Sequence, residues 1–124
     1  MLRDKTIASS FGDKTTRIYA PSNDYKCIQE IKRYDNIITS ICQLKDGTII
    51  TCSEDQSICI GDHKIINAHS QVINQVITLP NNRIASCSND FTVKIWKRAP
   101  SYSDIPIKIL EGHTDSVYSI IYIK

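Results

Sequence analysis

The chain has 124 residues, of which 23% are charged and 41% are apolar, and its formal net charge is +2. This length suits one domain and hardly two, and the balance of apolar and charged residues excludes a disordered chain. The small net charge gives no indication of a nucleic acid or an anionic membrane as partner.

Isoleucine dominates the apolar residues, with 23 Ile against 4 Val, 4 Leu and 5 Ala. Because β-branched side chains favour the pleated surface of a sheet, this composition favours an all-β fold. The longest apolar run, residues 120–123, is far shorter than the ~20 residues that a membrane span needs. The N-terminus carries charges where a signal peptide needs an apolar core, so we expect an intracellular, cytoplasmic chain, with the nucleus left open.

Alternation of apolar and polar residues predicts 12 short strands, separated by turn residues such as Asp46-Gly47 and Asn81-Asn82. A longer loop rich in Pro and Ser spans residues 98–104. The five Cys form no CxxC pair, so we expect reduced thiols and no metal site. The predicted strands are 6–11, 15–19, 26–32, 37–44, 48–52, 57–60, 64–67, 72–79, 83–87, 93–97, 105–110 and 117–123.

An internal repeat organises these strands. Three segments align without gaps, and each consists of an apolar strand, a polar turn that ends in Asp, and a second alternating strand. The segments are residues 7–20, 49–62 and 84–97, and their turn aspartates are Asp13, Asp55 and Asp90.

A second element recurs upstream of the strand pair. The residues around His69 match those around His113, and Tyr34 stands in the same frame. His69 precedes Asp90 by 21 residues, and Tyr34 precedes Asp55 by the same 21. A constant offset between two unlike elements indicates a true structural repeat.

These segments resemble the repeats of the WD-repeat (β-transducin repeat) family. Residues 68–97 match most fully, with His69, the Asn81-Asn82 turn, IASCSND and TVKIW. The family's unit ends in a Trp-Asp pair, and here Lys97 replaces the Asp of that pair. In the other units, Tyr19 and Gly61 stand where Trp96 stands.

The resemblance implies an all-β fold built from four-stranded antiparallel blades of a β-propeller, with about three blades' worth of strands. The expected divisions are a partial blade at 1–33, blades at 34–67 and 68–111, and the first strand of a further or closing blade at 112–124. Because a propeller typically closes with about four to eight blades, unpaired edges would remain. Either the protein continues past Lys124, or two copies form a six-bladed ring in which each lends its last strand to the other.

The family's pattern also implies a buried hydrogen-bond tetrad that joins His69, Ser86 (or Ser88), Asp90 and Trp96. An indole N–H needs an acceptor, and a hydroxyl can accept it while passing its own proton onward. The tetrad is expected to be structural.

Ser, His and Asp are also the residues that form the catalytic triad of a hydrolase. Here the Ser lies within a strand, no Gly-rich oxyanion loop follows it, and equivalents recur as Ser9 and Thr51. We therefore expect no enzyme, no catalytic residue, no cofactor and no metal ligand.

The resemblance implies a scaffold that binds proteins or peptides, which is a step by analogy. The family's top opening is lined by residues beside each turn Asp and before each first strand. The residues at these positions of the chain are polar and mildly acidic, which suggests a basic or polar peptide as partner. The alternatives are a propeller-based hydrolase and a nucleic-acid-associated WD-repeat protein. The candidate partner-binding residues are Asn36, Glu54, Gln71, Asn89 and Asp115, with Gly12 in the first unit.

Overall fold

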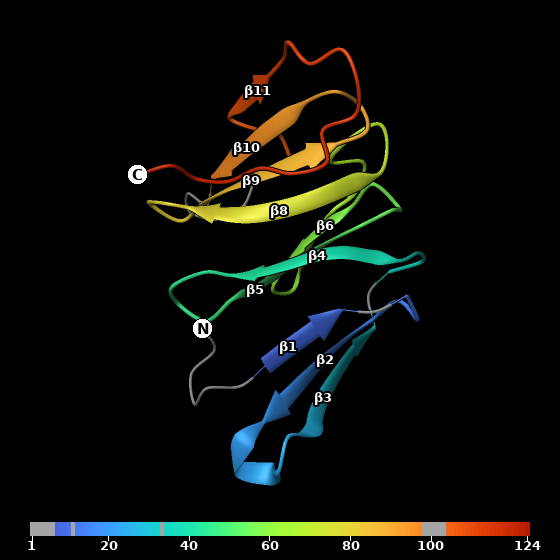
Figure 1. Ribbon diagram of the computed structural model, residues 1–124, viewed down its shortest axis with the longest axis vertical. Coiled ribbons are helices and arrows are strands. Elements are labelled where there is room, and N and C mark those ends of the chain that lie inside the picture. Colours follow the sequence, from blue (N-terminus) through green and yellow to red (C-terminus); the bar gives the residue numbers. More distant parts are fainter. Residues whose placement is uncertain (1–6, 11, 33, 98–103) are drawn as a thin grey trace.

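The computed structural model describes residues 7–10, 12–32, 34–97 and 104–124 of the chain. Within them the chain forms three antiparallel sheets and no α-helix, which confirms the all-β prediction. The sheets follow one another in chain order along the long axis of the molecule (Figure 1). They form an open stack of propeller blades, and the described strands close no barrel.

Each sheet is a meander in which consecutive strands are neighbours, and a short 3-10 turn, Pro21–Asn23, joins two strands of the first. The first sheet contains β1 (Ile7–Ser10), β2 (Thr15–Ala20) and β3 (Lys26–Lys32). The second contains β4 (Ile38–Gln43), β5 (Ile49–Ser53), β6 (Ile58–Ile60) and β7 (His63–Ile65). The third contains β8 (Ile73–Leu79), β9 (Arg83–Ser88), β10 (Val93–Lys97) and β11 (Lys108–Leu110).

The hairpin turns use residues that accept a left-handed backbone. Between β8 and β9, Asn81 and Asn82 have φ angles of 62° and 54°, as a two-residue type I′ turn requires. Between β4 and β5, the Asp46 carboxylate accepts the Thr48 N–H at 2.9 Å. Local turn chemistry therefore sets the register of these two strand pairs.

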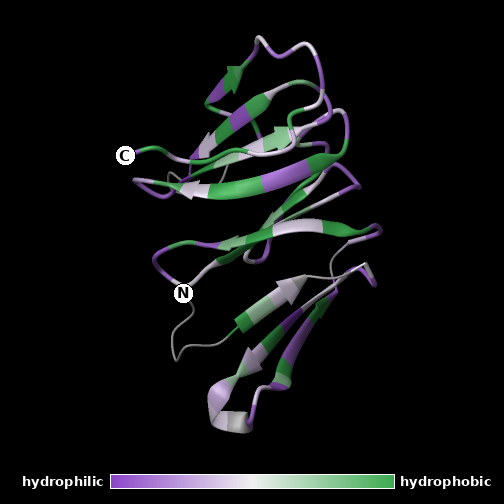
Figure 2. Cartoon of the chain, in the orientation of Figure 1, coloured by the Kyte–Doolittle hydropathy of each residue, from purple (hydrophilic) through white to green (hydrophobic). Residues whose placement is uncertain are grey.

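The largest core lies between the second and third sheets. Strands β4 and β8 lie side by side there, and the Thr39 hydroxyl donates to the Ile73 carbonyl at 2.5 Å. Hydrophobic residues recur along the strands of both sheets, whereas several of the connecting turns are hydrophilic (Figure 2). The repeated isoleucines thus supply much of the contact between blades. The bulkiest fully buried side chains of this core are Ile50, Ile58, Ile65, Ile73, Ile84 and Trp96.

Strand β11 is shorter than the predicted strand at 105–110. Pro106 has no N–H to donate to a ladder, and the first backbone bond after it joins the Ile107 N–H to the Ile95 carbonyl at 2.8 Å. The prediction of a strand over the whole of 105–110 was therefore too long.

Residues 117–123 pair with no strand among the described residues, so the prediction that they form the first strand of a further or closing blade stays a prediction. Side-chain amides of β8 hold this segment: Asn74 Nδ2 donates to the Val117 carbonyl at 2.9 Å, and Gln75 Oε1 accepts the Ile120 N–H at 2.7 Å. Alternation shows which residues face a core, but a strand also needs a neighbouring strand to complete its ladder. The segment instead packs over one face of the third sheet.

Candidate functional site

The three turn aspartates bind their own turns in the same way. Each carboxylate accepts the N–H and the hydroxyl of the residue two positions later, and we call this arrangement the Asp clamp. The intervening residue has a left-handed backbone in all three sheets, with φ angles of 69°, 71° and 71°. Because L-residues other than Gly seldom adopt this conformation, the clamp must hold it in place. The clamp pairs are Asp13–Thr15, Asp55–Ser57 and Asp90–Thr92.

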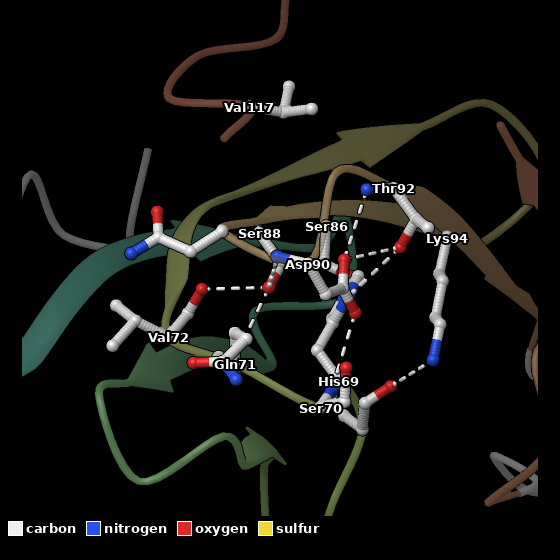
Figure 3. Close-up of polar contacts among 12 residues, drawn as sticks. His69, Ser70, Gln71, Val72, Ser86, Ser88, Asp90, Thr92, Lys94 and Val117 are labelled. Atoms are coloured by element: carbon white, nitrogen blue, oxygen red, sulfur yellow. Dashed lines mark hydrogen bonds and ion pairs between the residues drawn. The ribbon is translucent and has the colours of Figure 1, made fainter. Parts of the chain in front are cut away.

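In the third sheet the clamp ends a buried chain of hydrogen bonds (Figure 3). Trp96 Nε1 donates to Ser86 Oγ at 2.9 Å. Ser86 Oγ lies 2.7 Å from His69 Nε2, and His69 Nδ1 lies 2.8 Å from Asp90 Oδ2. A carboxylate can only accept, so Nδ1 carries the proton and Nε2 accepts from Ser86. The structure thus brings all four residues of the expected tetrad together, with every donor oriented toward Asp90.

The electrostatics favour a neutral imidazole beside a charged carboxylate. Burial lowers the pKa of His69 below its ordinary value, even though Asp90 acts in the opposite direction. Burial alone would raise the pKa of Asp90, but hydrogen bonds from Thr92 and His69 lower it to about 2. Lys94 Nζ also donates to the Ala68 carbonyl at 2.8 Å, so a cation lies close to His69.

Of the two serines that the sequence left open, Ser86 belongs to this chain of hydrogen bonds. Ser88 has a different role, because its hydroxyl donates to the Val72 carbonyl at 2.8 Å and accepts the Asp90 N–H at 3.1 Å. In the second sheet, Ser53 Oγ likewise donates to the Ile37 carbonyl at 2.9 Å. Ser53 and Ser88 therefore attach the clamp loop to the start of the sheet's first strand.

The second sheet builds its network differently, because Tyr34 replaces the histidine. The Tyr34 hydroxyl lies 2.6 Å from Thr51 Oγ1, the position equivalent to Ser86, and accepts the Cys59 N–H at 3.0 Å. Burial raises the pKa of Tyr34 well above its usual range. The Tyr34 hydroxyl therefore joins β5 and β6 at this position, where the third sheet has a histidine and a tryptophan.

The candidate partner-binding residues of the second and third sheets, with Asp115 of the segment that follows them, lie in loops along one side of the stack, and we call the set the loop rim. Glu54 N donates to the Ile37 carbonyl and Asn89 N donates to the Val72 carbonyl, both at 3.0 Å, so each clamp loop lies beside the start of a first strand. Glu54 and Asn89 are half-buried and the other members are exposed. The loop rim consists of Asn36, Glu54, Gln71, Asn89 and Asp115.

Sequence reasoning missed some of the polar groups around this site. The clamp hydroxyls of Ser57 and Thr92 were not singled out, although the repeated Asp-x-Ser/Thr spacing is a signal for them. The contact of Lys94 with Ala68 has no such signal, because it depends on how the strand and the loop meet.

The described residues give no indication of a metal centre. Among them no three His, Cys, Asp or Glu side chains are placed to share a metal ion. All five cysteines are free thiols. The part of the chain that the structure describes contains no helix of the length and hydrophobicity that crossing a membrane requires.

Comparisons with known proteins agree with this geometry. The family model of the WD domain, G-beta repeat, matches residues 25–62 and 63–97, which together make up more than half of the chain. Each match begins with the last strand of one sheet and continues through three strands of the next. WD repeats generally mediate protein–protein interaction, and proteins that contain them are generally non-enzymatic scaffolds.

A curated protein, the "WD repeat-containing protein 55 homolog" of Drosophila willistoni, is 28% identical over 114 residues, which cover 85% of this chain. The chain spans only 22% of the length of that relative. The repeat matches, the stacked sheets and the repeated Asp clamps lead to one assignment: the chain belongs to the WD-repeat family.

Proposed function

We propose that the chain forms part of a protein-interaction scaffold whose contact surface is the loop rim. The observation that carries the proposal is that polar loop residues of neighbouring sheets lie along one side of the stack, where each clamp loop lies beside the start of a first strand. Loops held on rigid sheets are where binding residues commonly lie. The only charged members of the rim, Glu54 and Asp115, are both acidic, so the partner class is a basic or polar peptide.

The test uses matched fluorescent peptides, one rich in Lys and Arg and one rich in Asp and Glu. Alanine at both Glu54 and Asp115 should weaken binding of the basic peptide about threefold or more at low salt. The matched control, with alanine at both Glu30 and Asp104, makes the same change of net charge away from the rim, because Glu30 lies on β3 and Asp104 contacts His63 at the other end of the second sheet. Unchanged affinity in the rim variant, or an equal loss in the control, would refute the proposal.

A second copy of the chain is a further candidate partner. The segment over the third sheet leaves large apolar side chains exposed, among them Tyr118 (71% exposed), Ile121 (77%) and Ile123 (79%). Apolar surface of this kind favours association. Two copies that complete a six-bladed ring should give a particle of twice the 14.0 kDa mass of one chain in light scattering. A folded monomer would rule this out.

The geometry gives little support to a hydrolase. The Ser86 side chain is fully buried and its oxygen already accepts the Trp96 N–H. A catalytic nucleophile must reach its substrate. A fluorophosphonate probe should therefore leave Ser86 unlabelled in the folded chain, and labelling of Ser86 would favour the enzymatic alternative. The net charge of +2 likewise gives no support to a nucleic-acid partner.

A further inference from the structure

Between the first and second sheets lies a partly open cavity of about 240 Å³. Thr16, Ile18 and Ile31 line it from the first sheet, and Ile49 and Thr51 line it from the second. Thr16 and Ile18 of β2 and Thr51 of β5 are buried, and their two sheets are neighbours in the stack (Figure 1). A cavity of roughly 150 Å³ is enough for a benzene ring, so this one has room for a larger aromatic group.

The repeat shows what fills the corresponding space one blade further along. Trp96 lies opposite Ile84 on β9, and its side chain is 1% exposed in the core between the second and third sheets. In the second sheet the equivalent pair is Gly61 opposite Ile49, joined by a bond from Gly61 N to the Ile49 carbonyl at 2.9 Å. The cavity therefore lies where the second sheet lacks the tryptophan of the third.

The chain cannot readily fill this space from position 61. Gly61 has a φ angle of +56°, which disfavours any residue with a β-carbon. A β-carbon there would also lie 3.3 Å from Thr48 Cγ2, tighter than an ordinary contact. An aromatic group would have to come from outside the repeat.

The polar groups of the cavity match an indole. In the third sheet, Ser86 Oγ accepts the indole N–H while it donates to His69. Thr51 Oγ1 holds the equivalent position and contacts the Tyr34 hydroxyl, and since a hydroxyl oxygen can accept two hydrogen bonds it keeps capacity for another. The charged group in the lining is Asp62, an exposed carboxylate, which complements an N–H donor and a neighbouring cation.

We propose that this cavity binds the tryptophan side chain of a partner peptide that carries a basic residue beside the tryptophan. This inference rests on the proposed scaffold function, and it adds a second contact point. The turns that hold Gly47 and Gly61 lie at the opposite end of the second sheet from Asn36 and Glu54. Binding at the cavity and binding at the loop rim can therefore be separated by mutation.

The test follows the backbone amides of the full chain by NMR while an N-acetylated, C-terminally amidated Lys-Trp dipeptide is added. Saturable shifts should centre on Thr51, Cys59 and Gly61. The Ile31→Phe variant places a larger side chain in the cavity and should weaken binding about tenfold or more. The matched Ile28→Phe variant changes an exposed side chain of the same strand and should leave affinity within about twofold.

The hydrogen bond is tested separately with indole and 1-methylindole. Thr51→Val should weaken indole about fivefold, the effect of one lost hydrogen bond, and leave 1-methylindole unaffected because that molecule has no N–H to donate. Circular dichroism verifies that each variant is folded. If Thr51→Val fails to fold, the Ile31→Phe and Ile28→Phe pair still decides the matter.

Other outcomes separate this inference from the proposed function. Equal dipeptide affinity in Ile31→Phe and the wild type, or shifts centred on the loop rim, would overturn the cavity site while leaving the rim proposal intact. Saturable binding at the cavity would support the cavity site even if alanine at Glu54 and Asp115 caused no loss of basic-peptide binding. If free indole bound the cavity but the Lys-Trp dipeptide did not, the inference would also be overturned, because the indole must enter while attached to a peptide.

Discussion

The indole Nε1 of Trp96 lies 2.9 Å from Ser86 Oγ, and both side chains are almost completely buried. Ser86 therefore satisfies two ring nitrogens, since it accepts from Trp96 and donates to His69. An unpaired polar group in such a place costs more than a hydrogen bond gains at the surface. The stability of the third sheet should depend strongly on this one hydroxyl.

Removing that hydroxyl gives the first prediction. Ser86→Ala leaves the Trp96 N–H and His69 Nε2 without a partner, and should lower the free energy of unfolding by about 2–4 kcal/mol. Urea unfolding followed by the fluorescence of Trp96 measures the change. The control is Ser70→Ala, which alters an exposed side chain and keeps its backbone bond to Asp90. Equal stability of both variants would contradict the role assigned to Ser86.

Acid should weaken the fold in two steps. Because the pKa of His69 is lower in the folded chain than its unfolded value of about 6.5, the unfolded chain takes up the proton first, and the free energy of unfolding falls as pH drops below that value. The stabilisation from Asp90 is complete above about pH 4 and is lost as pH falls toward its folded pKa of about 2.

Stability measured against pH tests this for His69. His69→Gln should remove the slope between about pH 7 and 5, whereas the exposed His113→Gln should keep it. An NMR titration of the wild-type imidazole gives the same information without a variant. If the His69 ring of the folded chain is protonated above its ordinary pKa, the predicted direction of the pH dependence of stability is wrong.

Gly61 offers a test of backbone conformation. Gly61→Ala places a β-carbon at a φ angle of +56° and 3.3 Å from Thr48, and should cost about 1–2 kcal/mol of stability. In the matched Gly12→Ala variant the new β-carbon has no heavy atom within 4 Å, and the change should stay below about 1 kcal/mol. Thermal or urea unfolding compares the two. A smaller loss at Gly61 than at Gly12 would mean that the left-handed turn is not required.

The cysteines should differ sharply in reactivity. Burial raises the pKa of Cys42 and Cys52 to about 12 and that of Cys87 to about 11, and Cys59 is also buried. Cys27 is exposed. Iodoacetamide at about pH 8 should therefore label Cys27 first, because the thiolate is the reactive form and needs access to solvent. Peptide mass spectrometry reads the order, with the chain in guanidinium as the control in which all five react.

The sequence was informative wherever a feature is local or repeats at a fixed spacing. The gapless repeat located the three turn aspartates, although not their Ser and Thr partners, and the constant offset of 21 residues placed Tyr34 and His69 in equivalent positions. The choice between Ser86 and Ser88 could not be made, because both lie on the same face of β9 and only the neighbouring loop distinguishes them.

Features that depend on neighbouring elements were not predictable. Residues 117–123 alternate like a strand, yet the side chains of Asn74 and Gln75 hold them in place of a strand ladder. The cavity beside Gly61 was also missed. The missing tryptophan was visible in the sequence, but whether the adjacent sheet would collapse into the space was not.

The Asp clamp has a consequence for sequence variation. The residue inside the clamp is Lys14 in one blade, Gln56 in the next and Phe91 in the third, although all three have the same left-handed backbone. Since the flanking Asp and hydroxyl residue fix the conformation, the fold places little demand on the identity of the side chain between them. Each blade thus carries an interchangeable display position at the tip of a rigid turn, where recognition groups or reporter dyes can be grafted and the scaffold kept.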